Sequence, residues 1–209
     1  MHLIFDFDGT LVNSFYHVVK KTSLLADEFN FRKIKDHEIE SLRDLTSLEV
    51  LRFLEIPIYN LPRVISRIRK HLHNDMPSLA PVANIRNVLE KLYNAHFSLG
   101  ILTSNSVENV TLWLDIHDMR HYFDYIHAES RLFSKKHLMK KTLERYKIDK
   151  STAFYIGDET RDIDAARKNA IHSVAVTWGY NSEKVLLQHQ PSFMVRKPEE
   201  LLILFGLQK

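Results

Sequence analysis

Short apolar runs alternate with stretches of helical periodicity along most of the chain. The apolar runs, each of a length that suits a buried strand, occupy residues 2–8, 97–102, 125–128, 153–156 and 173–177. Apolar residues recur at the spacing of one helix face in residues 85–95, 107–115, 136–146 and 162–169. This alternation predicts βαβ units, and therefore an α/β fold with a Rossmann-like parallel sheet covered by helices on both faces.

An early segment breaks the alternation, because it holds several helix-like stretches and no convincing strand. Residues 46–49 (Thr-Ser-Leu-Glu) have the form of a capping box that opens a helix, and Pro57 ends that stretch. A further helix is expected over residues 61–72, and two prolines near residue 80 mark the return to the alternation. We therefore predict a catalytic core interrupted by an all-helical cap, with the core at residues 1–14 and 81–209 and the cap at residues 15–80.

Composition narrows the choice of class and partners. A chain of 209 residues with 44% apolar side chains can bury a core. The net charge of +3 is too small to favour nucleic acid or a membrane surface as a partner. Without cysteine there is neither a disulfide nor a thiolate metal site, and no apolar run approaches the length of a membrane span or a leader peptide. We expect a cytoplasmic protein, monomeric or homodimeric.

Two carboxylates stand where the first strand is expected to end. Asp6 and Asp8 are separated by one residue and followed by Gly9 and Thr10. Ligand sites of open parallel sheets lie beyond the carboxyl ends of the strands, and two like charges there are costly unless a cation or a reaction requires them. The alternative for such a pair is an ordinary turn after a strand.

Polar residues follow later strands in the same way. Residues 103–106 (Thr-Ser-Asn-Ser) can donate to an anionic oxygen, and they also suit the start of the helix near Val107, so both roles are compatible. Lys135 and Lys136 follow Leu132-Phe133-Ser134 at the start of another helix; their alternative is a solvated helix face.

The last of these signals is a pair of acids after the strand at 153–156. Asp158 and Asp162 supply oxygen ligands that suit a Mg²⁺ ion placed opposite Asp6. The competing interpretation assigns Asp162 and Glu159 to the amino-terminal turn of a helix, where the helix dipole favours negative charge. It accounts less well for Asp158, which lies at the strand end.

The order of these signals, D-x-D-G-T, then a threonine, a lysine and G-D-x-x-x-D, resembles the haloacid dehalogenase-like hydrolases. The similarity covers nearly the whole chain and is greatest to the phosphoglycolate phosphatase-like subgroup, which has a helical cap after the first motif. The resemblance implies a Mg²⁺-dependent phosphatase that acts on a small phosphorylated metabolite. A cap of this size favours a small substrate over a phosphoprotein.

The resemblance also implies roles for individual residues. Asp6 is the nucleophile that becomes an aspartyl phosphate, and Asp8 is the general acid and base. The phosphoryl group is held by polar side chains of the second and third motifs, namely Thr103, Ser104, Asn105 and Lys135. The metal is held by acidic residues of the first and fourth motifs, namely Asp6, Asp8 (through its backbone carbonyl), Asp158 and Asp162.

Several choices stay open at this point. Lys135 is preferred over Lys136 because it lies two residues after Phe133, and Glu159 is an alternative to Asp162. A phosphomutase would share all the motifs, and a binding module of low activity would share the fold. The basic positions of the cap between Arg63 and His73 could attract an anionic substrate, but a solvated amphipathic helix is the preferred interpretation.

Overall fold

The computed structural model describes residues 1–128 and 135–208. Its centre is a parallel sheet in the order β3-β2-β1-β4-β5-β6. The strands are β1 (His2–Phe5), β2 (Ser98–Thr103), β3 (Tyr125–Ala128), β4 (Ala153–Gly157), β5 (His172–Val176) and β6 (Phe193–Val195). The winding direction reverses at β1, which pairs with β2 on one side and β4 on the other. Such a reversal opens a crevice at the carboxyl ends of these strands.

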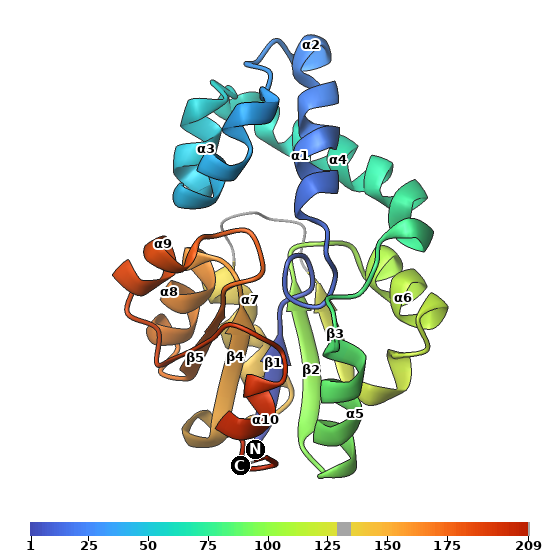
Figure 1. Ribbon diagram of the computed structural model, residues 1–209, viewed down its shortest axis with the longest axis vertical. Helices are drawn as coiled ribbons and strands as arrows, with labels where there is room; N and C mark the ends of the chain where they lie inside the picture. The colour runs from blue at the N-terminus through green and yellow to red at the C-terminus, as the bar shows by residue number, and fades with distance from the viewer. Residues whose placement is uncertain (129–134, 209) are drawn as a thin grey trace.

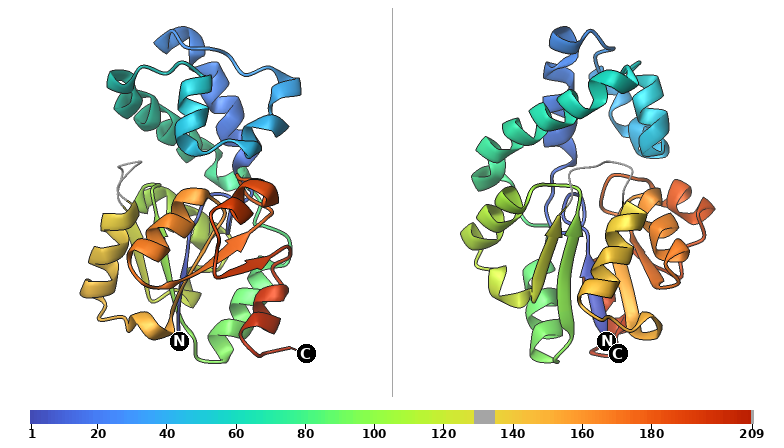
Figure 2. Two further views of the ribbon diagram at one scale, coloured as in Figure 1. Left: turned by 90° about the vertical axis from the view of Figure 1, so that its left-hand side faces the viewer. Right: turned by 180° about the vertical axis from the view of Figure 1, so that it is seen from behind.

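Helices cover both faces of this sheet, as Figure 2 shows. They are α5 (Ile85–Asn94), α6 (Val107–Ile116), α7 (Lys135–Arg145), α8 (Thr160–Lys168), α9 (Glu183–Gln188) and α10 (Glu200–Leu204). Successive residues of β1 serve opposite faces: Leu3 and Phe5 pack in the core layer with α5, α6 and α10, and Ile4 packs in the layer with α7 and α8. The predicted fold class is confirmed.

A cap of short helices lies above the carboxyl ends of the strands (Figure 1). Its α-helices are α1 (Phe15–Leu24), α2 (Ala26–Phe29), α3 (Ser47–Phe53) and α4 (Leu61–Asp75). The 3-10 helices of the chain are η1 (Asp36–Glu38), η2 (Glu40–Asp44), η3 (Ile58–Asn60), η4 (Met76–Ser78), η5 (Arg120–Tyr122) and η6 (Lys150–Thr152). The cap has its own apolar cluster, which includes Leu54, Ile56, Leu61 and Val64. The domain boundaries at residues 15 and 80 stay a prediction.

Local sequence features explain where α3 begins and ends. The capping box opens α3, because Thr46 accepts from the Glu49 N–H and Glu49 accepts from the Thr46 N–H. Contrary to expectation, α3 ends at Phe53 rather than at Pro57, since Glu55 has a left-handed backbone with φ of 55°. The sequence analysis missed the short elements β6, α9 and α10. Within the described part of the chain, no helix combines the length and apolar character that crossing a membrane requires.

The stripe of α5 provides a test of the sheet–helix packing. Leu89 is fully buried in the core cluster, so Leu89→Ala is expected to lower the free energy of unfolding by about 2–5 kcal/mol. Glu90→Ala, at the exposed neighbouring position, is expected to change it by less than about 0.5 kcal/mol. Urea denaturation measures both, and equal losses in the two variants would contradict the packing described.

Candidate active site

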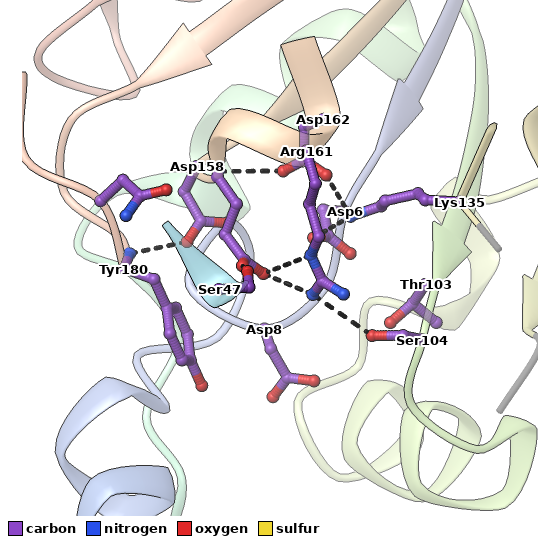
Figure 3. Close-up of polar contacts among 12 residues, drawn as sticks. Asp6, Asp8, Ser47, Thr103, Ser104, Lys135, Asp158, Arg161, Asp162 and Tyr180 are labelled. Atoms are coloured by element: carbon purple, nitrogen blue, oxygen red, sulfur yellow. Dashed lines mark hydrogen bonds and ion pairs between the residues drawn. The ribbon is translucent and has the colours of Figure 1, made fainter. Parts of the chain in front are cut away.

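The ends of three neighbouring strands bring the predicted polar residues together at the sheet edge below the cap. Asp6 follows β1, Thr103 ends β2 and Asp158 follows β4. β1 and β4 are parallel, with Phe5 beside Ile156. Asp6 therefore lies beside Gly157, and Asp158 is the next residue of the chain. Lys135, at the start of α7, points at the same place (Figure 3).

Three carboxylates form a compact cluster at this edge. Asp6, Asp158 and Asp162 are buried, and each offers an oxygen within 4.8 Å of the others. A Cβ at Gly157 would lie 2.3 Å from Asp162 Oδ2, so only glycine leaves room for this arrangement. Hard oxygen ligands at such separations fit a Mg²⁺ ion.

Asp158 is fixed from two directions. The Thr10 hydroxyl donates to its Oδ1 at 2.7 Å, and the backbone N–H of Tyr180 donates to its Oδ2 at 2.7 Å. A Cβ at either Gly9 or Gly179 would approach Asp158 atoms to 2.2 Å. Gly9 also has a φ of +76°, which favours glycine. These constraints hold the carboxylate in place before any ligand binds.

The cluster holds more negative charge than its lysine neutralises. Lys135 Nζ donates to Asp6 Oδ2 at 2.5 Å and is also paired with Asp162. Burial raises the pKa of Asp6 against the opposing effect of Lys135. Burial raises the pKa of Asp162 to about 6, and burial followed by the charge of Asp6 raises that of Asp158 well above its usual range. A bound cation would relieve this repulsion.

The structure distinguishes the surroundings of Lys135 from those of Lys136, and those of Asp162 from those of Glu159. Lys135 is buried against Asp6, whereas Lys136 is exposed. Glu159 has both oxygens engaged, because Arg161 Nε donates to Oε1 at 2.9 Å and the Ser47 hydroxyl of α3 donates to Oε2 at 2.6 Å. These contacts favour Lys135 as the active-site lysine and Asp162 over Glu159 as the metal ligand. Phe133, which supported the sequence argument, lies outside the described residues.

The loop after β2 donates a hydrogen bond to the Asp8 carboxylate. Asn105 Nδ2 donates to Asp8 Oδ2 at 2.8 Å, and the Asn105 N–H donates to Thr103 Oγ1 at 3.0 Å. Ser106 caps α6 by accepting from a backbone N–H of its first turn, so the helix-start interpretation of this loop is confirmed. Burial raises the pKa of Asp8, while the nearby Ser14 hydroxyl and Asn105 amide lower it. Phosphate binding by Thr103, Ser104 and Asn105 stays a prediction.

A cavity of about 240 Å³ separates the carboxylates from the cap. Apolar side chains of the cap form much of its lining, and its polar side chains include Asp8, Arg69, Arg161 and Tyr180. Small-molecule sites have this combination of an apolar wall and a few polar groups. Asp8, Glu159 and Arg161 contribute to its lining from the core side, next to the carboxylate cluster.

The positions of Arg69 and Arg161 in this cavity were not predicted from the sequence. Arg69 of α4 donates to the backbone carbonyl of Ser104, and Nδ1 of His73 lies 2.7 Å from Asn109 Oδ1. These two positions contact the core, whereas Arg63, Arg67 and Lys70 are exposed, so the interpretation as a solvated amphipathic helix fails only at Arg69 and His73. The available signal was their spacing of four residues beside the apolar stripe of α4, which places them on the packed side of the helix.

Comparison with known proteins identifies the family. A family model described as haloacid dehalogenase-like hydrolase matches residues 3–176. The chain belongs to this family. A phosphoglycolate phosphatase from Synechococcus elongatus is 32% identical to this hydrolase over 96% of the chain and 94% of its own length.

Two further proteins are similar at lower sequence identity, one of them through its solved structure. The pyrophosphatase PpaX from Bacillus pumilus is 21% identical over 98% of this hydrolase and 95% of its own length. The crystal structure of a protein described as a predicted phosphatase, from Clostridium acetobutylicum, superimposes with a TM-score of 0.85 at 23% identity, over 99% of this chain and 98% of that one. The predicted family and enzyme class, a phosphatase among the haloacid dehalogenase-like hydrolases, are confirmed.

The charge of the cluster can be tested by thermal unfolding. In EDTA at pH 8, Asp158→Asn is expected to melt at or above the wild-type temperature. A carboxyl whose pKa is raised on folding stabilises the protein at low pH, and that contribution is lost as pH rises through the folded-state pKa. Mg²⁺ at about 100 times its dissociation constant is expected to raise the wild-type melting temperature by roughly 5–10 °C.

The variant is expected to lose most of this gain from Mg²⁺. Asp164→Asn provides the matched control, because Asp164 lies on the same helix α8 outside the cluster. The control should respond to Mg²⁺ as the wild type does. A full Mg²⁺ response in Asp158→Asn would show that the cation binds elsewhere.

Proposed function

We propose that the protein is a Mg²⁺-dependent phosphatase that hydrolyses a small phosphate monoester through an aspartyl phosphate on Asp6. The observation that carries the proposal is the surroundings of Asp6. Its carboxylate lies in the buried acidic cluster with Lys135 Nζ 2.5 Å from Oδ2. Asp8, two residues later, lines the cavity in which a substrate would lie.

In the first step, a carboxylate oxygen of Asp6 attacks phosphorus and the bond from phosphorus to the ester oxygen breaks. Asp8 donates a proton to the departing oxygen, which leaves as an alcohol. Lys135 and the Thr103 hydroxyl hold the oxygens of the transferred group and stabilise their growing charge.

In the second step, water attacks the phosphorus of the aspartyl phosphate. Asp8, now ionised, takes a proton from this water as the new bond to oxygen forms. The bond between phosphorus and Asp6 breaks, inorganic phosphate leaves, and the Asp6 carboxylate is restored. Asp8 is thereby protonated again for the next catalytic cycle.

The buried acidic cluster fits a resident Mg²⁺ ion, and Asp6, Asp158, Asp162 and the backbone carbonyl of Asp8 would hold it. Bound Mg²⁺ would supply the positive charge that offsets repulsion between the Asp6 carboxylate and a phosphate dianion. Lys135 compensates part of this charge from the side of α7.

The cavity supports a small substrate. A space of about 240 Å³ under the cap accommodates a metabolite and excludes a folded protein. The names of the relatives, phosphoglycolate phosphatase and pyrophosphatase, supply the first compounds to assay. We propose 2-phosphoglycolate as the first candidate, because the relative that carries this name shares 32% of residues over nearly the whole chain.

The nucleophile is tested by Asp6→Asn. The wild type is expected to release phosphate from p-nitrophenyl phosphate and from at least one ester of a panel that includes 2-phosphoglycolate, pyrophosphate and sugar phosphates, in a Mg²⁺-dependent manner. The variant is expected to lose at least about a thousand-fold in kcat, because an amide is not a nucleophile. Phosphate release measures both. Transfer of phosphate to another position of a sugar, without release, would favour a phosphomutase.

The lysine assignment is tested by a matched pair. Lys135→Ala is expected to lower kcat about 100- to 1,000-fold, because it removes a fixed positive charge from the transferred group. Lys136→Ala removes an exposed lysine from the adjacent position and is expected to leave kcat within about two-fold. Larger loss in Lys136→Ala than in Lys135→Ala would contradict the assignment.

A further inference from the structure

A chain of hydrogen bonds connects the cap to Asp8. Asn105 Nδ2 donates to Asp8 Oδ2 at 2.8 Å, and Asn109 Nδ2 of α6 donates to Asn105 Oδ1 at 3.0 Å. Nδ1 of His73, on cap helix α4, lies 2.7 Å from Asn109 Oδ1. Four side chains from three parts of the molecule thus form one continuous series.

The orientation of each amide in the series is fixed by a second contact. Asn105 Oδ1 also accepts from the Ser106 N–H at 2.8 Å, so the Asn105 amide nitrogen must face Asp8. Asn109 Nδ2 also donates to the backbone carbonyl of Arg69 at 3.3 Å, so Asn109 Oδ1 must face His73. His73 Nδ1 is therefore the donor, because an amide oxygen only accepts. Turning the Asn105 amide over would break three hydrogen bonds, and turning the Asn109 amide over would break the two that its nitrogen donates.

Burial makes these orientations firm. Asn105 is 3% exposed and Asn109 is 2% exposed. Hydrogen bonds are stronger in such low-dielectric surroundings, and an unpaired amide there is costly. His73 is exposed at the cap surface. The two asparagines are therefore held rigidly, whereas His73 can be substituted without disturbing the core.

The series makes the two oxygens of Asp8 unequal. Oδ2 receives the Asn105 N–H, whereas Oδ1 is buried and accepts no hydrogen bond from the part of the chain that is described. The Asn105 amide is therefore a contact that fixes how the Asp8 carboxyl is turned at the wall of the cavity.

We propose that Asn105, Asn109 and His73 are positioning residues that hold the Asp8 carboxyl at the wall of the cavity, in the orientation from which it gives its proton to the leaving oxygen. This inference rests on the proposed function, in which Asp8 is the general acid. The cap supplies the last member of the series, so contact of α4 with α6 completes the alignment of the acid. Asn109 and His73 act on the reaction through Asn105 and Asp8.

The test compares two aryl esters that differ in their need for proton donation. p-Nitrophenyl phosphate has a leaving group that departs readily as an anion, whereas phenol, with a pKa of about 10 like that of tyrosine, needs a proton. Asn109→Leu is expected to lower kcat/KM roughly 10- to 100-fold for phenyl phosphate. It is expected to change kcat/KM for p-nitrophenyl phosphate less than about three-fold.

Variants of His73 test the same idea without altering the buried core. His73→Leu removes the donor and is expected to shift the ratio of the two kcat/KM values in the same direction as Asn109→Leu. His73→Asn places an amide N–H at the position of Nδ1 and is expected to recover most of the wild-type ratio. His71→Leu, on the same helix outside the series, is expected to leave the ratio unchanged.

The outcomes separate this inference from the proposed function. A wild type that hydrolyses neither ester would overturn the proposed function, and the positioning role with it. An active wild type whose folded Asn109 and His73 variants lose equally on both esters, or lose nothing, would overturn the positioning role alone. A loss confined to phenyl phosphate, with recovery in His73→Asn, is the predicted result.

Discussion

The structure depends on the burial of like charges at one edge of a parallel sheet. Asp6, Asp158 and Asp162 lie out of water with Lys135 between two of them. Uncompensated, such an arrangement costs several kcal/mol for each ion. The fold meets this cost with local devices: glycines that give the carboxylates room, a hydroxyl and a backbone N–H on Asp158, and a lysine at the start of α7. The proposed reaction requires the same concentration of charge.

The cap contributes to this edge from two sides. On one side, the segment around η2 is tied to the loop after β5, where Asn181 Nδ2 donates to the Leu45 carbonyl at 2.8 Å and Ser182 N–H donates to the Arg43 carbonyl at 2.8 Å. On the other side, α4 reaches the loop after β2 and the start of α6 through Arg69 and His73. Apolar side chains of the cap line the cavity between these contacts, and the buried carboxylates below interact more strongly than they would in water.

The sequence predicted what depends on short-range pattern. Asp6, Thr103 and Asp158 could be placed because each stands where an apolar run ends, and parallel strands bring such positions to one edge. The choices between Lys135 and Lys136, and between Asp162 and Glu159, depended on which way a helix start faces, and tertiary contacts decide that. Arg69 and His73 were misjudged because their partners lie on the core. The elements β6, α9 and α10 are too short to show a clear period.

The most direct test of this account is chemical trapping of the intermediate. Wild type and Asp8→Asn would be mixed with a ³²P-labelled ester that the enzyme hydrolyses, quenched in acid within one turnover, and digested for peptide mapping. The account predicts label on the peptide that contains Asp6, released by hydroxylamine as an acyl phosphate would be. Label on any other residue, or an enzyme that turns over with no labelled peptide at any time, would contradict Asp6 as the nucleophile.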